Sequence, residues 1–108
     1  MGSLTKEEIK RVILSHKELL KKYNVKSLAL FGSSVRGEMT VQSDIDFLVE
    51  FDKSAFGINF EGYSDNYFGL LFSLEEIFKT KIDLLTIEMI SPYMKPFILK
   101  EAEYFEAA

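Results

Sequence analysis

The sequence predicts an α/β (α+β) fold in which a small mixed β-sheet is covered by helices. Three apolar segments have the composition or the alternation of β-strands, namely residues 27–31, 44–51 and 81–87. Two longer stretches, residues 5–23 and 64–79, carry apolar side chains at helical spacing. We therefore expect one short sheet with the two long helices packed against it.

The first helix is predicted for residues 5–23. Thr5 and Glu8 have the spacing of a capping box, in which each side chain can bind an amide at the start of the helix. An apolar stripe follows at helical spacing, made of Ile9, Val12, Ile13, Leu19, Leu20 and Tyr23. His16, the single histidine, lies on this stripe. We expect it to be a partly buried helix residue with a local hydrogen bond and not a catalytic base.

The second half of the chain predicts another long helix and a short one. Helical spacing extends over residues 64–79, with Ser64 or Asp65 as the cap. The apolar positions are Tyr67, Leu70, Leu71, Leu74, Ile77 and Phe78. Further on, Ser91-Pro92 has the residue types of a helix cap followed by a first helical position. Pro96 then interrupts or restarts this last helix, because an interior proline removes a backbone hydrogen bond.

Two carboxylates stand at the beginning of the second predicted strand. Asp44 and Asp46 share a face, because residues two apart on a strand point the same way. The opposite face is apolar and consists of Ile45, Phe47, Val49 and Phe51. Aligned carboxylates repel each other unless a cation lies between them. Because Mg²⁺ prefers a few hard oxygen ligands together with water and substrate phosphates, this pair indicates a metal-bound nucleoside triphosphate.

A glycine–serine pair ends the first predicted strand, where a short helix could begin. Gly32 allows close backbone approach, Ser33 adds a hydroxyl donor, and the amides that follow can bind phosphate oxygens. Arg36 adds a permanent positive charge. It either binds a phosphate oxygen or pairs with a nearby carboxylate, and the sequence leaves both roles open.

Composition excludes several classes of function. The 108 residues fit one domain spanning 1–108, in which residues 1–3 have the composition of an expression scar. A formal net charge of -4 argues against a broad nucleic-acid interface, which needs clustered Lys and Arg. Cysteine is absent and no apolar run approaches the length of a membrane span. We therefore expect a cytoplasmic protein that binds neither membranes nor nucleic acid directly.

These residues together resemble the motif of the minimal nucleotidyltransferases of the DNA polymerase beta superfamily, which reads Gly-Ser, then Arg-Gly, then Ser-Asp-x-Asp. Here the motif runs Gly32-Ser33-Ser34-Val35-Arg36-Gly37 and, after five residues, Ser43-Asp44-Ile45-Asp46. Val35 stands where members of the family usually have alanine. The likeness extends to the C-terminal segment, covers nearly the whole chain, and implies the polymerase beta-like nucleotidyltransferase fold.

The resemblance also implies a set of site residues. Asp83, a single acidic residue in the third apolar segment, would be the third carboxylate of the site. The implied catalytic residues, which are also the ligands of two Mg²⁺ ions with Mn²⁺ as an alternative, are Asp44, Asp46 and Asp83. The implied nucleotide-binding residues are Gly32, Ser33, Arg36 and Ser43.

The resemblance implies an activity and a partner. A hydroxyl of the acceptor would attack the α-phosphorus of ATP, and pyrophosphate would leave. Small stand-alone members of the family are antitoxins that neutralise a HEPN ribonuclease toxin by transferring AMP to one of its tyrosines. A HEPN-type toxin is therefore the expected partner. Two alternatives stay open, namely a non-catalytic antitoxin or binding module that masks its partner, and a nucleotidyltransferase for small molecules of the aminoglycoside type.

Overall fold

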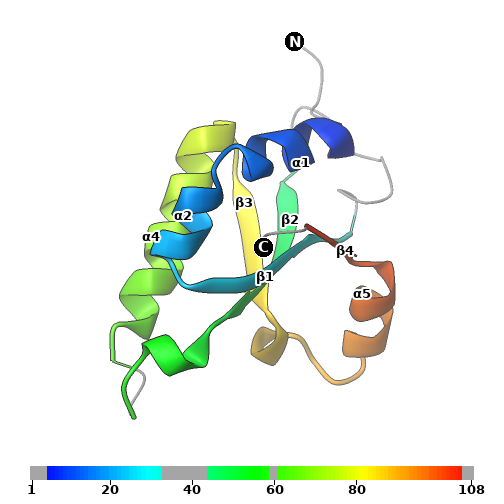
Figure 1. Cartoon of the computed structure of the whole chain (residues 1–108). Helices are drawn as coiled ribbons and strands as arrows, with labels where there is room; N and C mark the ends of the chain where they lie inside the picture. Colours follow the sequence, from blue (N-terminus) through cyan, green and yellow to red (C-terminus); the bar gives the residue numbers. More distant parts are fainter. Residues whose placement is uncertain (1–4, 33–43, 59–60, 106–108) are drawn as a thin grey trace.

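A mixed β-sheet forms the centre of the fold. The computed structural model describes residues 5–32, 44–58 and 61–105. Its strands are β1 (Val25–Leu30), β2 (Ile45–Phe51), β3 (Ile82–Thr86) and β4 (Glu103–Tyr104), in the order β3-β2-β1-β4. β1 is antiparallel to β2 and β4, whereas β2 and β3 are parallel (Figure 1). The predicted mixed sheet of three segments is confirmed, and β4 adds a short strand that the sequence did not predict.

Four α-helices and two short 3-10 helices surround this sheet in the described part of the chain. The α-helices are α1 (Lys6–Leu14), α2 (Lys17–Lys22), α4 (Tyr63–Phe78) and α5 (Lys95–Glu101). The 3-10 helices are η1 (Lys53–Ala55) and η2 (Ile87–Met89). The long helix predicted for residues 64–79 is confirmed within one residue at each end, since α4 covers Tyr63–Phe78.

The helix predicted for residues 5–23 is divided in two at Ser15 and His16. The Ser15 hydroxyl donates to the carbonyl of Val12 at 2.7 Å, and Nδ1 of His16 lies 2.8 Å from the same oxygen. Side chains that bind nearby backbone groups in this way compete with helical hydrogen bonds. The local hydrogen bond predicted for His16 is confirmed, but the predicted partial burial is wrong, because the residue is exposed. The capping box at Thr5 and Glu8 is confirmed.

The last helix begins at Lys95 and not at Ser91-Pro92. Ser91 instead closes a turn, in which its hydroxyl accepts a hydrogen bond from the amide of Met94 at 3.3 Å. Pro96 lies in the first turn of α5, where its missing N–H costs nothing. Pro96 was predicted either to interrupt or to restart the last helix, and it lies at the start of α5.

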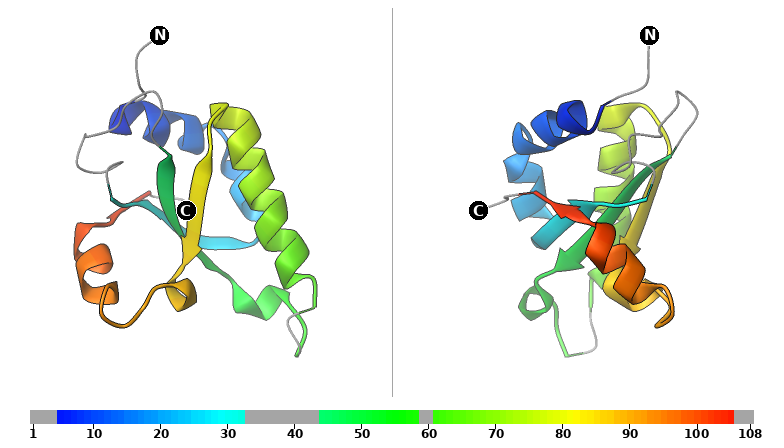
Figure 2. Two further views of the ribbon diagram at one scale, coloured as in Figure 1. Left: turned by 180° about the vertical axis from the view of Figure 1, so that it is seen from behind. Right: turned by 90° about the vertical axis from the view of Figure 1, so that its right-hand side faces the viewer.

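The two faces of the sheet are covered differently. The helix face packs against α1, α2 and α4, and its buried cluster includes Ile9, Ile13, Leu20, Leu28, Leu30, Ile45, Phe47, Val49, Leu70, Leu74 and Leu84. The other face, which we call the carboxylate face, carries a smaller cluster of Ala29, Phe31, Leu48 and Ile90 with Leu85, Ile87, Ile98 and Ala102 against it. Figure 2 shows α5 across the sheet from α2. The predicted alternation of apolar side chains along β2 is thus confirmed.

The C-terminal strand is tied to the first helix by charge. The Glu103 carboxylate on β4 accepts from Nζ of Lys6 at 2.8 Å and of Lys10 at 3.2 Å. These bonds lower the pKa of Glu103, with the hydrogen bond from Lys6 as the largest cause. The amide of Phe105 also donates to the carbonyl of Leu28 at 2.8 Å. β4 therefore braces β1, the strand that leads directly to Gly32.

No helix in the described ranges is long and apolar enough to cross a membrane.

Candidate active site

Two of the predicted carboxylates are direct neighbours across the sheet. Asp46 on β2 and Asp83 on β3 are register partners in the parallel ladder, and partners of this kind lie about 5 Å apart at their backbones. Both belong to the carboxylate face, because Leu48 and Leu85, each two residues further along, pack in its apolar cluster. Asp46 is half-buried and Asp83 is exposed. Strand pairing therefore places two acidic side chains together next to solvent.

Gly32 lies against one member of this carboxylate pair, Asp46. It directly follows Phe31, whose amide donates to the carbonyl of Asp46 at 3.1 Å. A Cβ atom added to Gly32 would lie 2.6 Å from Oδ2 of Asp46, which is closer than real contacts allow. Its φ of 64° is also in the left-handed region that favours glycine. Both observations explain why a residue without a side chain ends β1 beside the site.

Asp44 extends the acidic edge by one step before β2 begins. The amide of Ile45 donates to the carbonyl of Lys81 at 3.2 Å, so the segments that precede β2 and β3 lie side by side. Nζ of Lys81 is 4.0 Å from Oδ2 of Asp44, and both side chains are well exposed. An exposed pair at this distance contributes little stability. Lys81 is nevertheless a cation at the site that the sequence analysis did not assign.

The outer edge of β3 is held by α4 on both sides of Asp83. The Tyr67 hydroxyl donates to the carbonyl of Leu84, and the amide of Ile82 donates to Oε2 of Glu75 at 3.5 Å. Burial raises the pKa of Tyr67, and the negative charge of Asp83 raises it further. The hydroxyl therefore stays protonated and can donate at neutral pH. Periodicity identified Tyr67 only as a member of an apolar stripe, and Glu75 gave no signal.

The donor set fits a hard divalent cation that arrives with a nucleotide. Asp46 and Asp83 offer carboxylate oxygens from adjacent strands, and Mg²⁺ is commonly bound by one or two carboxylates plus phosphates and water. In the described ranges no three His, Cys, Asp or Glu side chains are grouped closely enough to hold a metal by themselves. A site of protein ligands alone is therefore not formed here. Joint binding by all three aspartates stays a prediction.

Four of the seven predicted site residues lie in the described part of the chain. The structure places Gly32 beside Asp46 and pairs Asp46 with Asp83, and Asp44 lies directly before the strand that carries Asp46. The other three are Ser33, Arg36 and Ser43, which lie outside the described residues.

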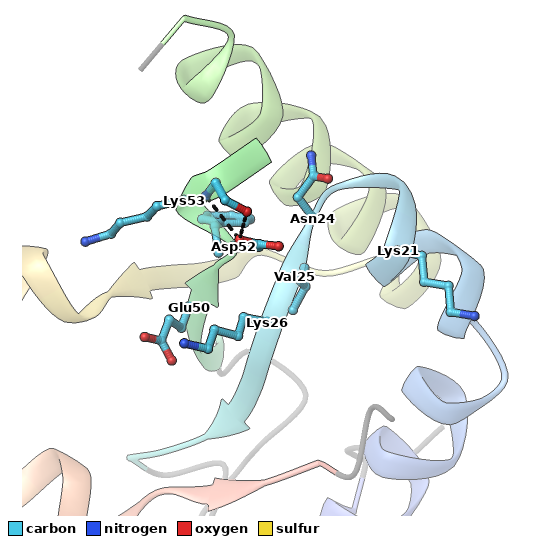
Figure 3. A pocket seen from close by; sticks show the side chains of 9 residues that line it. Lys21, Asn24, Val25, Lys26, Glu50, Asp52 and Lys53 are labelled. Atoms are coloured by element: carbon cyan, nitrogen blue, oxygen red, sulfur yellow. Dashed lines mark hydrogen bonds between the residues drawn. The ribbon is translucent and has the colours of Figure 1, made fainter. Parts of the chain in front are cut away.

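A pocket of about 620 Å³ lies at the other end of the β1–β2 pair. It is lined by the beginning of β1 and the end of β2, together with side chains such as Lys26, Glu50 and Asp52 (Figure 3). Lys21 and Lys53 point away from each other, so their charges do not converge. Asp52 binds Ser54 through the backbone amide and the hydroxyl, and these bonds lower its pKa. Asp52 is therefore engaged by Ser54, and Lys21 and Lys53 bring no joint charge to the pocket.

The comparisons with known proteins agree with this geometry. Residues 9–105 match the family described as "Nucleotidyltransferase domain". The protein named "Putative protein adenylyltransferase MJ1379" from Methanocaldococcus jannaschii is 46% identical over 102 residues, which cover 93% of this chain and 97% of the relative. The resemblance indicated by the sequence motif is confirmed.

Solved structures support the fold. The protein titled "Structure of putative minimal nucleotidyltransferase" superposes with a TM-score of 0.73 at 24% identity, covering 93% of this chain and 95% of the other. Another is titled "Crystal structure of the toxin-antitoxin with AMP-PNP" and has a TM-score of 0.61 at 19% identity, covering 88% and 70%. The predicted nucleotidyltransferase fold is therefore confirmed.

Proposed function

The chain belongs to the nucleotidyltransferase domain family, and from this premise we propose that it is a protein adenylyltransferase that transfers AMP from ATP to a tyrosine of a HEPN-type toxin. The observation that carries the proposal is the meeting of Asp46, Asp83 and Gly32 at one edge of the sheet. Paired carboxylates beside a glycine that admits close approach suit a nucleotide with its cation. The carboxylate face is also open to solvent at Asp83, where an acceptor can enter.

The reaction divides among the residues as follows. The acceptor oxygen forms a bond to the α-phosphorus, the bond to the bridging oxygen of pyrophosphate breaks, and the hydroxyl proton passes to a carboxylate. We assign that proton to Asp83, because it is the exposed member of the pair. Asp44 and Asp46 would hold the cations, which supply charge stabilisation to the attacking and leaving oxygens when bound. Gly32 and the residues that follow it would position the β- and γ-phosphates.

Support for a protein acceptor comes from relatives. A relative that matches nearly the full length of the chain carries the name of a protein adenylyltransferase, and a structure of the same fold is titled as a toxin-antitoxin with AMP-PNP. The net charge of -4 also disfavours a nucleic-acid acceptor. A toxin is thus the acceptor that these observations favour.

The proposal is tested by following two labels separately. The protein is incubated with Mg²⁺ and a lysate of its host, using ATP labelled at the α-phosphate in one sample and at the γ-phosphate in another. We expect α-label on a protein band and none from the γ-position. Asp46→Asn should abolish the band, whereas Glu50→Gln, on the same face of the same strand, should keep it.

Three results would count against the proposal. Label from the γ-position would indicate phosphoryl transfer instead. The partner should also be produced in the absence of the chain, so that it is unmodified at the start. If this partner binds the chain but acquires no α-label, the masking antitoxin is favoured. Modification of an aminoglycoside by the purified protein would favour the small-molecule enzyme.

A further inference from the structure

We propose that exposed apolar side chains around the start of α5 form the surface on which the protein acceptor docks, an inference that rests on the proposed function. The surface, here called the α5 ridge, consists of Met89, Tyr93, Met94 and Phe97. In this proposal the α5 ridge selects the acceptor protein and brings the hydroxyl of that protein to the carboxylate pair. The occupant we assign is the acceptor protein itself, with an apolar patch beside the modified hydroxyl.

The four side chains of the α5 ridge are each at least half exposed to solvent. Tyr93 is 86% exposed, Phe97 68%, and Met89 and Met94 are each 52% exposed. Single exposed apolar residues are ordinary, but four within nine positions mark a site for a partner. Aromatic residues and methionine are also the types enriched in the core of protein interfaces. The inner side of α5 is used by the fold, since Ile98 and Ala102 pack on the sheet.

The α5 ridge belongs to the face that carries the carboxylates. α5 covers the cluster that contains Leu48, on the face that carries Asp46. The ridge begins beyond the end of β3, because Met89 lies in η2, whereas Asp83 is the second residue of β3 and lies about 10 Å before the strand ends. A standard interface buries about 800 Å² on each partner, which corresponds to a patch roughly 30 Å across. One protein bound to the α5 ridge would therefore also reach the carboxylate pair. This shared face is the reason for assigning the ridge to the acceptor.

A second exposed apolar group lies on α4 and serves for comparison. Phe68 and Phe72 on α4 are 49% and 61% exposed, and their rings stack at 6.0 Å between centroids. α4 packs on the helix face through Leu70 and Leu74, and its Glu75, which follows Phe72 by three residues, reaches the outer edge of β3. The pair is thus a matched control of similar exposure and chemistry.

The charged residues in the segment 88–101, which contains the ridge, indicate which kind of contact the partner makes. Glu88 and Glu101 are balanced by Lys95 and Lys100, so the segment has no net charge. Long-range steering by this part of the surface is therefore weak, and recognition depends on apolar contact. We expect the KM for the protein acceptor to change little between low and moderate salt.

The test compares two double variants on the acceptor that the α-label experiment identifies, purified in its unmodified form after production in the absence of the chain. In Tyr93→Ser/Phe97→Ser we expect the KM for the acceptor to rise at least about tenfold, while the Kd for ATP is unchanged. Phe68→Ser/Phe72→Ser should match the wild type in both quantities. Circular dichroism and light scattering report folding and oligomeric state, and Phe97→Arg alone provides a second, single-site disruption of the ridge.

The outcomes separate the two proposals. Wild-type KM in both ridge variants, or a rise confined to the α4 variant, overturns the docking surface but leaves the transferase intact. A change from dimer to monomer without a change in KM means that the ridge binds a second copy, which also overturns it. If the wild type labels no protein, the proposed function fails, and the α5 ridge loses its assigned occupant with it.

Discussion

The two faces of the central sheet differ in how completely they are covered, and the difference separates stability from chemistry. On the helix face, side chains of β1, β2 and β3 are buried under α1, α2 and α4. On the carboxylate face, the cover provided by the described residues consists of η2 and α5, and Asp83 is exposed. Adjacent residues of one strand therefore serve different ends, with Phe47 in the core and Asp46 beside Gly32. Substitutions on the carboxylate face should lower the rate of transfer, whereas substitutions on the helix face should lower the stability of the fold.

The largest effect on activity is expected from Asp46→Asn on the carboxylate face. The amide keeps the size of the side chain but removes the charge that would hold the cation, so transfer should fall at least about a thousandfold, equivalent to roughly 4 kcal/mol. The melting temperature should stay close to that of the wild type. Initial rates of α-label transfer and a thermal melt measure both quantities. An active Asp46→Asn protein would remove Asp46 from the mechanism.

Phe47→Ala, one residue further on, should act through stability. The Phe47 ring is fully buried and lies 6.0 Å from the ring of Phe78 and 6.2 Å from that of Phe105. Truncating a buried phenylalanine costs about 3–5 kcal/mol of unfolding free energy. Urea unfolding measures this loss. At temperatures where the variant remains folded, the rate of transfer per folded molecule should equal that of the wild type, and a lower rate would contradict the separation of the faces.

Gly32→Ala tests whether the site requires the close approach of the Gly32 backbone to the Asp46 carboxylate. The added Cβ must displace the Asp46 carboxylate, and the left-handed φ is strained for alanine, at a cost of about 1–3 kcal/mol. We expect weaker ATP binding and slower transfer together. Gly57→Ala is the control, because an added Cβ there meets only ordinary contact with Glu61. Equal effects in the two variants would show that the close approach to Asp46 is irrelevant.

Tyr67→Phe probes the support of β3 from the helix face. Loss of the hydroxyl leaves the carbonyl of Leu84 without its donor from α4, which costs about 1 kcal/mol. Because Leu84 adjoins Asp83, we expect kcat to fall about tenfold while the Kd for ATP is retained. Tyr104→Phe, on the exposed β4, is the control. If kcat and ATP affinity decline in parallel, Tyr67 has only a general structural role.

The smallest effect concerns the tie between β4 and α1. The pKa of Glu103 is lowered below its ordinary value of 4.5, so this carboxylate stabilises the fold above that pH. The contribution is lost as pH falls below 4.5 through the lowered pKa. Glu103→Gln should therefore melt slightly below the wild type at pH 7, and the difference should shrink as the pH is lowered through this range. A difference that is constant with pH would contradict this assignment.

Much of the fold could be predicted because its signals are local. The alternation along residues 44–51 predicted the buried face of β2, and the capping box predicted the start of α1. The break at Ser15 and His16 was missed because two side chains compete for one carbonyl, which periodicity does not reveal. β4 was missed because a two-residue strand has no alternation and depends on pairing with β1.

The sequence indicated candidate residues for the site but not how they are arranged. Asp46 and Asp83 could be proposed from a motif, yet their register depends on parallel pairing of strands far apart in sequence. Tyr67 could not be found, because its partner is a backbone carbonyl that carries no sequence signal. Lys81 became visible only when β2 and β3 were placed side by side.

The central claim is that the nucleotide binds where Gly32, Asp46 and Asp83 meet, and equilibrium binding of ATP with Mg²⁺ tests it most directly. Titrations of the wild type, Asp46→Asn and Glu50→Gln separate this site from the pocket at the other end of β1 and β2. We predict that Asp46→Asn weakens binding at least about tenfold and that Glu50→Gln leaves it unchanged. Binding that survives Asp46→Asn and is lost in Glu50→Gln would place the nucleotide at the other end and contradict the account.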